Sequence, residues 1–173
     1  ASGILFNHES PLRGREFVTR KISFQLAKII QGEKTPIQLG NLNSKRDWGY
    51  APDYILAMEE IINAKNMDDY IISTNEVASV RDFFKRCAIV AGFNPVFEGE
   101  GINEKCIDRK SSQVLCEVNK SYFRKSEVVF LKGDYSKINK AFDWKPSSLW
   151  GDIAEKMIIS DIEFMDKKYL YGI

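Results

Sequence analysis

A polar turn followed by basic residues is the first part of this sequence that could do chemistry. The turn Asn7–Pro11 directly follows the apolar run Ser2–Phe6. Polar turns at the carboxyl ends of buried strands are where open α/β sheets place their ligands. The basic side chains that come next are those of Arg13, Arg15, Arg20 and Lys21.

These basic side chains suit a phosphate. An arginine can hold a phosphate through parallel, charge-assisted hydrogen bonds, and a lysine supplies a point charge. A solvated basic surface at the start of a helix is an equally ordinary interpretation. The helix dipole favours the ligand slightly, because cations are unfavourable at a helix N-terminus unless an anion joins them.

A second candidate lies in the segment Gly40–Gly49. Its glycine-bearing turn would let the backbone approach a ligand while Arg46 reaches a phosphate. The composition by itself favours another interpretation, a surface ion pair of Lys45 and Arg46 with Asp47, beside a half-buried Trp48.

The third candidate is the segment Tyr122–Glu127, in which an aromatic ring, an arginine and a carboxylate would cradle a base and a ribose. Taken alone this segment is a weak signal. The three candidates together suggest an anionic ligand with an aromatic or sugar portion, such as a nucleotide. They do not name a reaction.

The composition narrows the class of protein. The chain has 173 residues, 44% hydrophobic and 28% charged, which is ordinary for one globular domain. Its net charge of +1 argues against a nucleic-acid partner, and no apolar run is long enough for a membrane helix. Three cysteines without a C-x-x-C pair favour a reduced cytosol, and a single histidine, His8, excludes most zinc sites.

Elements that would position these residues alternate between strands and helices, which predicts an α/β fold. The expected strands are Ser2–Phe6, Pro36–Gly40, Asp69–Ser73, Pro95–Phe97 and Gln113–Glu117, with a polar loop between the last two. The expected helices are Glu16–Gln31, the stretch from Pro52 to Ala64, Val80–Ala91, Ser136–Phe142 and a last helix capped by Ser148.

Several expectations concern burial. The strand Ser2–Phe6 is apolar enough to require neighbours on both sides, and it has nothing upstream to pair with. One apolar helix face is predicted from Ile22, Leu26, Ile29 and Ile30, and a buried stripe from Ile55, Met58 and Ile62. On the last helix, one side is predicted to carry Trp150, Ile153, Met157, Asp161 and Phe164. Ser79 and Asp82 predict a capping box for the helix that carries Cys87, a core residue.

These residues carry a resemblance to the GDP-mannose 4,6-dehydratases, members of the extended short-chain dehydrogenase/reductase family. The run NHESP with FVTRKI is far more specific than a lone glycine motif. The matching segments keep the family's order and spacing; they are Gly3–Pro11, Phe17–Ile22, Leu39–Leu42, Arg46–Gly49, Tyr122–Arg124 with Glu127, and Gly133–Asp134 through Trp144–Pro146.

The resemblance implies conversion of GDP-mannose to GDP-4-keto-6-deoxy-mannose, on the route to GDP-fucose, with a bound NADP as cofactor. It implies a Rossmann-like fold in a cytoplasmic homo-oligomer. In that family the residues matching His8 and Arg13 contact NADP or a neighbouring subunit, and the one matching Asn7 lies beside the substrate diphosphate. The GDP site is lined by the residues matching Val18, Lys21, Arg46, Arg124 and Glu127.

Only the carboxyl-terminal half of the family is matched. The Gly-rich dinucleotide turn and the catalytic Tyr-x-x-x-Lys lie upstream in relatives, and none of the seven tyrosines here has a lysine four residues later. We therefore expect residues 1–173 to be a single nucleotide-sugar-binding domain that lacks its cofactor half and catalyses nothing by itself. Two alternatives stay open, the substrate half of a related GDP-sugar reductase or epimerase, and a non-catalytic binding or assembly module.

Overall fold

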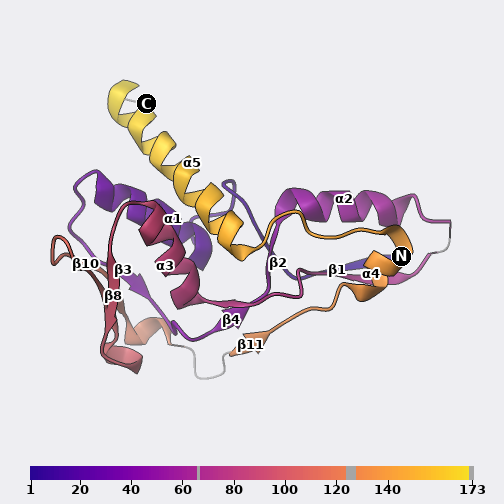
Figure 1. Cartoon of the computed structure of the whole chain (residues 1–173), viewed down its shortest axis with the longest axis horizontal. Coiled ribbons are helices and arrows are strands. Elements are labelled where there is room, and N and C mark those ends of the chain that lie inside the picture. The colour runs from indigo at the N-terminus through magenta and orange to yellow at the C-terminus, as the bar shows by residue number, and fades with distance from the viewer. Residues whose placement is uncertain (66, 124–127, 172–173) are drawn as a thin grey trace.

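The computed structural model describes residues 1–65, 67–123 and 128–171 and has the predicted α/β content (Figure 1). The helices are α1 (Val18–Ile30), α2 (Ala51–Ile62), α3 (Val80–Val90), α4 (Ser136–Phe142) and α5 (Trp150–Tyr171), with short 3-10 turns η1 (Gly101–Asn103) and η2 (Lys120–Tyr122). The strands are β1 (Ser2–Leu5), β2 (Asn7–Glu9), β3 (Ile37–Leu39), β4 (Lys45–Arg46), β5 (Trp48–Tyr50), β6 (Asp69–Ile72), β7 (Ala78–Ser79), β8 (Pro95–Glu98), β9 (Lys105–Asp108), β10 (Val114–Val118) and β11 (Phe130–Leu131).

The strands of the described residues form four small sheets. β1 pairs in parallel with β6, and β2 pairs in parallel with β5. The largest sheet has the order β3-β10-β9-β8, and β4 lies between β11 and β7 in a three-stranded sheet. The polar loop expected before β10 thus contains an additional strand, β9, which pairs antiparallel with both of its neighbours.

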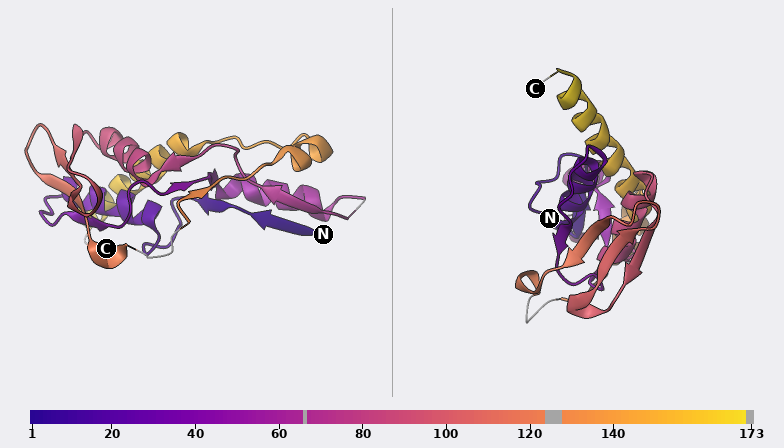
Figure 2. Two further views of the ribbon diagram at one scale, coloured as in Figure 1. Left: turned by 90° about the horizontal axis from the view of Figure 1, so that it is seen from below. Right: turned by 90° about the vertical axis from the view of Figure 1, so that its left-hand side faces the viewer.

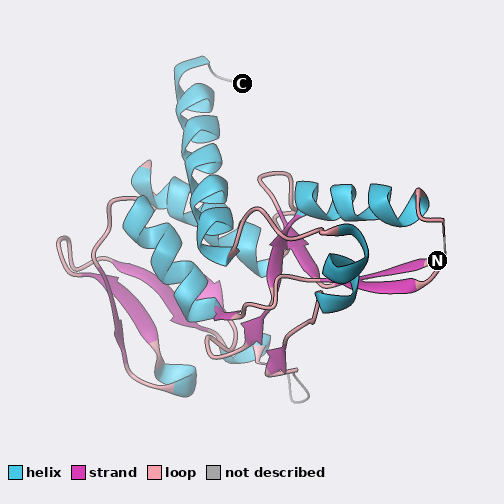
Figure 3. Ribbon diagram, turned by 45° about the vertical axis from the view of Figure 1, so that its right-hand side comes forward, coloured by secondary structure: helices cyan, strands magenta, loops and turns pink. Residues whose placement is uncertain are grey.

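Two apolar clusters hold these elements together. In the first, α1, α3 and α5 pack beside the four-stranded sheet, around residues such as Leu26, Phe83 and Met157 (Figure 1). The second joins α2, β6 and α4 through residues such as Tyr54 and Ile138. Figure 2 shows an elongated molecule, with β1, α2 and α4 at the end opposite the four-stranded sheet. The strands β2, β4 and β5 lie between the two ends, as Figure 3 also shows.

The helix α3 has the predicted start. The hydroxyl of Ser79 accepts a hydrogen bond from the backbone N–H of Asp82 at 3.1 Å, and the Asp82 carboxylate accepts one from the backbone N–H of Ser79 at 3.0 Å. This reciprocal pair is a capping box, which satisfies backbone donors that a helix start leaves free. Cys87 on this helix is fully buried, and burial raises the pKa of its thiol, which agrees with the predicted core role.

The predicted buried stripe of α2 is wrong for Ile55 and Ile62, whereas Met58 is partly buried and packs against the second apolar cluster. Ile55 is 61% exposed and Ile62 is 76% exposed, whereas Tyr54 and Ile61 are buried. The face that packs is therefore one residue earlier than expected. Apolar residues occur almost all round this helix, so their spacing does not select one face, and contact with β6 and α4 decides which side is buried.

The strand β1 is formed as predicted, but it is not buried. Its partner within the described residues is β6, and Ile4 is 52% exposed. Two other predicted core side chains are also partly exposed, Ile30 at the end of α1 and Phe164 on α5. The remaining residues of these two helix faces are buried, except for the half-buried Trp150; they are Ile22, Leu26, Ile29, Ile153, Met157 and Asp161.

The exposed strand β1 leads us to expect that the chain self-associates. A parallel pair with an open edge invites another copy to add a strand. Replacing Ile4 with lysine is expected to weaken self-association about tenfold or more, since burying an isoleucine contributes roughly 1.5–3 kcal/mol. Sedimentation equilibrium measures this, with Ile89→Lys as control because Ile89 is similarly exposed on α3. A stable monomer of the unsubstituted chain at high concentration would refute the prediction.

Candidate functional site

An open cleft of about 440 Å³ is lined by residues from α1, the end of β3, β4, β5 and η2. Val18 and Lys21 line it from α1, Arg46 lines it from β4, and Tyr122 lines it from η2. These residues come from three separate candidates of the sequence, the basic turn, the Gly40–Gly49 segment and the Tyr122–Glu127 segment. The tertiary structure thus brings at least one residue of each candidate to this cleft.

Lys21 and Tyr122 contact each other in this cleft. The Lys21 ammonium lies 4.3 Å from the centroid of the Tyr122 ring, within the range of a cation–π interaction. Partial burial lowers the pKa of Lys21, because the charged form loses hydration. An anion placed beside this ammonium would replace the lost hydration, so the cleft favours a negatively charged ligand.

Gly40 is required here by a close approach of backbone to backbone. A Cβ at this position would lie 2.8 Å from the carbonyl oxygen of Tyr122, too close for any other residue without a shift. The backbone N–H of Asn119 donates to the carbonyl of Leu39 at 2.8 Å and ties the same two segments together. The glycine therefore lets η2, rather than a ligand, approach the end of β3.

The predicted surface ion pair around Asp47 is wrong. Asp47 is fully buried, and its carboxylate accepts hydrogen bonds rather than lying on the surface. These come from Thr74 N (2.8 Å), Thr74 Oγ1 (2.7 Å), Asn75 N (3.1 Å) and Gly133 N (3.2 Å). Trp48 is 1% exposed instead of half-buried and packs edge-on against Phe83. Arg46, between Lys45 and Asp47, thus starts from a firmly held strand and lines the cleft.

A second, smaller cleft of about 320 Å³ is lined by Asn7, His8 and Arg13 together with apolar residues at the end of β1, directly after it and in β11. β2 carries Asn7 and His8, and its parallel pairing with β5 fixes their place. The imidazole of His8 lies 5.4 Å from the ring of Tyr54 and within 3.1 Å of the Phe6 carbonyl.

The buried carboxylate of Glu9 holds Arg13, which lines the smaller cleft. It is 2% exposed, it accepts a hydrogen bond from Thr19 Oγ1 at 2.6 Å, and it pairs with Arg13 Nε at 3.3 Å. Burial raises the pKa of Glu9, while the hydrogen bond from Thr19 and the charge of Arg13 act in the opposite direction. The Arg13 guanidinium also lies 3.6 Å from the centroid of Phe17, which lines the first cleft.

The predicted site residues are thus divided between two clefts. Val18, Lys21 and Arg46 share the larger one, and Asn7, His8 and Arg13 share the smaller one. Arg124 and Glu127 lie outside the described residues. Asn41 and Ser44 of the predicted segment Gly40–Gly49 also line the larger cleft, although the sequence singled out only Arg46 there as a ligand-binding side chain. Small polar residues in a turn carry no signal that separates a binding role from an ordinary turn. The Ser44 hydroxyl is buried and has no hydrogen-bond partner among the described residues.

Two kinds of feature were not found in the described part of the chain. No helix there is long and apolar enough to cross a membrane. No cluster of three or more histidine, cysteine, aspartate or glutamate side chains there could hold a metal ion.

Comparison with solved structures supports the fold class. The chain is similar to the RMD protein of Pseudomonas aeruginosa, solved in complex with NADPH, with a TM-score of 0.72 and 17% identity, over 94% of this chain and 47% of that one. It is also similar to dTDP-glucose 4,6-dehydratase of Bacillus anthracis, solved with NAD, with a TM-score of 0.67 and 12% identity, over 96% and 45%. The chain therefore has the α/β fold of an extended short-chain dehydrogenase/reductase, and it covers under half of such a protein.

Comparison of sequences gives the family. The chain is 42% identical to the human GDP-mannose 4,6 dehydratase over 164 residues, which is 95% of this chain and 44% of that protein. It is 38% identical to the enzyme of Sinorhizobium fredii, over 95% of this chain and 47% of that one. The chain thus spans somewhat under half the length of these relatives. The family model for GDP-mannose 4,6 dehydratase matches residues 1–157, so the chain belongs to the GDP-mannose 4,6-dehydratase family.

Proposed function

We propose that this chain is the GDP-sugar-binding portion of a GDP-mannose 4,6-dehydratase, a lyase that converts GDP-mannose to GDP-4-keto-6-deoxy-mannose. What supports the proposal most directly is the larger cleft, where Lys21 and Arg46 supply positive charge and Tyr122 supplies an aromatic face. Its volume of about 440 Å³ falls in the range typical of small-ligand sites, roughly 300–1,000 Å³. The guanosine diphosphate moiety is the part recognised here.

The smaller cleft is proposed to contact part of NADP, which accepts and returns a hydride when it is bound. An imidazole and a guanidinium at its wall suit a phosphate or a nicotinamide ribose. At about 320 Å³ the cleft is too small for a whole dinucleotide, so His8 and Arg13 would hold one portion of it. Arg13 is oriented for this by the buried Glu9 carboxylate. The complete enzyme is proposed to be a cytoplasmic homo-oligomer.

Binding of guanosine diphosphate tests the nucleotide assignment. Titration of the chain in a calorimeter is expected to show binding of guanosine diphosphate that is tighter than binding of uridine diphosphate. The two ligands share the diphosphate and ribose, so the difference reports recognition of the base. Equal or preferential binding of uridine diphosphate contradicts the guanine assignment while leaving an anion site at Lys21 and Arg46.

The chain alone is proposed to be inactive. Dehydration requires a hydride acceptor over the sugar and a base for the sugar hydroxyl, and the 173 residues contain neither a Gly-rich dinucleotide turn nor a Tyr-x-x-x-Lys pair. Incubation of the same preparation with GDP-mannose and NADP is expected to yield no 4-keto product. Turnover that follows the chain through purification would overturn this part of the proposal.

A further inference from the structure

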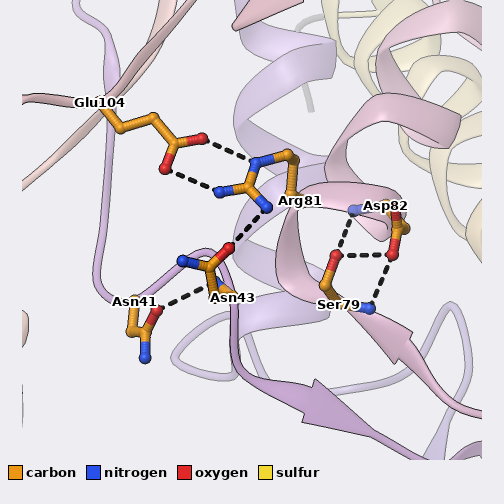
Figure 4. Close-up of polar contacts among 6 residues, drawn as sticks. All are labelled: Asn41, Asn43, Ser79, Arg81, Asp82 and Glu104. Atoms are coloured by element: carbon orange, nitrogen blue, oxygen red, sulfur yellow. Dashed lines mark hydrogen bonds and ion pairs between the residues drawn. The ribbon is translucent and has the colours of Figure 1, made fainter. Parts of the chain in front are cut away.

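The loop after β3 supplies much of one wall of the larger cleft. Gly40, Asn41 and Ser44 all line the cleft from this loop. The loop is short and irregular, so its conformation depends on what holds it from behind. That support comes from α3, whose first residues lie against the loop (Figure 4).

Backbone hydrogen bonds give the first part of this support. The N–H of Val80 donates to the carbonyl of Ser44 at 3.1 Å, and the N–H of Arg81 donates to the carbonyl of Leu42 at 3.0 Å. These bonds anchor the far part of the loop to the start of α3. They do not depend on the identity of the Arg81 side chain.

The side chain of Arg81 gives the second part of the support. Its Nη1 donates to the Asn43 side-chain oxygen at 2.7 Å, and the backbone N–H of Asn43 in turn donates to Asn41 Oδ1 at 2.9 Å. Asn41, one of the residues that line the cleft, is thus linked to α3 through a chain of hydrogen bonds (Figure 4).

The Arg81 guanidinium is itself fixed in orientation. Its Nε and Nη2 donate to the two carboxylate oxygens of Glu104 at 2.7 and 2.8 Å, a bidentate arrangement that sets the plane of the guanidinium. Glu104 is 5% exposed and immediately precedes β9. The four-stranded sheet therefore determines, through Glu104 and Arg81, where Asn43 and Asn41 lie.

We propose that Arg81, oriented by Glu104, is a positioning residue for ligand binding in the larger cleft and acts through Asn43 on Asn41. This inference rests on the proposed binding of guanosine diphosphate. Arg81 itself is absent from the cleft lining, so its effect on affinity is indirect. A cleft wall that is already ordered gives a higher affinity, because the free energy of binding is not reduced by the entropy lost in ordering the loop.

Arg81→Met and Asn43→Leu test the proposal by removing one hydrogen bond, from Arg81 Nη1 to the Asn43 side-chain oxygen, from its donor and from its acceptor side. Each is expected to weaken binding of guanosine diphosphate about 3- to 10-fold, the range that one or two lost hydrogen bonds would give. Asn43→Asp keeps an acceptor for Arg81 and is expected to bind as the unsubstituted chain does. Arg86→Met is the matched control, because Arg86 lies on the same helix and pairs with Glu155 at 2.6 Å, on the surface.

The melting temperature, measured on each variant, separates positioning from stability. A purely structural role for Arg81 would lower the melting temperature of Arg81→Met and leave the dissociation constant unchanged, and that result overturns the proposal. Equal losses of affinity in Asn43→Leu and Asn43→Asp also overturn it. If the unsubstituted chain does not bind guanosine diphosphate, the proposed function fails, and the role of Arg81 fails with it.

Discussion

Replacing Arg46 with alanine is expected to weaken binding of guanosine diphosphate about 10- to 100-fold, because a charge-assisted hydrogen bond contributes roughly 1.5–3 kcal/mol. Arg46 lines the larger cleft from β4, together with Lys21 of α1 and Tyr122 of η2. A guanidinium can hold two oxygens of a diphosphate at once, so removing it takes contacts away from the ligand. We therefore expect Arg46→Ala to lower the affinity for guanosine diphosphate and to leave the melting temperature unchanged. Calorimetric titration of the variant measures the affinity.

Lys45→Ala is the control for this substitution. Lys45 precedes Arg46 in the same strand and is exposed outside the cleft, so removing its charge tests whether any nearby cation matters. We expect its affinity for guanosine diphosphate to change less than twofold, roughly the effect of one exposed charge. Unchanged affinity of Arg46→Ala with a sharply lower melting temperature would mean that Arg46 serves the fold and not the ligand.

Replacing Asp47 with alanine is expected to lower the free energy of unfolding by roughly 3–5 kcal/mol. The carboxylate is fully buried and accepts four hydrogen bonds, from Thr74, Asn75 and Gly133. Alanine removes the acceptor of the backbone N–H groups of Thr74, Asn75 and Gly133 and leaves the volume of the carboxylate unfilled. Because Asp47 joins β4 to the segments around residues 74 and 133, Arg46 is expected to lose its fixed position as well.

Urea unfolding measures this loss, with the slope compared between variants to confirm a two-state transition. Asp68→Asn is the control: its carboxylate pairs with Lys137 at 2.7 Å, and both side chains are 53% exposed. Exposed pairs of this kind contribute about 0–1 kcal/mol, so the control should unfold almost as the unsubstituted chain does. A loss below about 1 kcal/mol in Asp47→Ala would contradict the assigned role of this carboxylate.

The sequence by itself determined the elements whose signals are local. The capping box of Ser79 and Asp82 predicted the start of α3, because the partners are three residues apart and the interaction closes within one helical turn. The spacing of Ile22 and Leu26 predicted the buried face of α1 for the same reason, since one side of that helix is clearly more apolar than the other. The types of the basic and aromatic residues also indicated an anionic, nucleotide-like ligand.

Other features are not local, and only the tertiary structure decided them. The two-residue strands β4 and β7 exist because they pair with each other and, for β4, with β11 some 85 residues along the chain. α2 is apolar on nearly every side, so its buried face is the one that packs against β6 and α4. Asp47 beside Arg46 looks like a surface ion pair in sequence, but its hydrogen-bond donors come from residues 74–75 and 133.

The candidate site also has features that the sequence determines and features that only the tertiary structure decides. The sequence supplied the side chains Lys21, Arg46 and Tyr122, and nothing in their spacing, over about a hundred residues, places them together. The approach of η2 to Gly40 and the pairing of β4 with its neighbours bring them to one cleft. Residue type sets which ligand chemistry is favourable, because charge and hydrogen-bonding capacity belong to the side chain. The convergence of Lys21, Arg46 and Tyr122 depends on the packing of distant segments. The free energy that keeps these segments together comes from burial and hydrogen bonds throughout the fold.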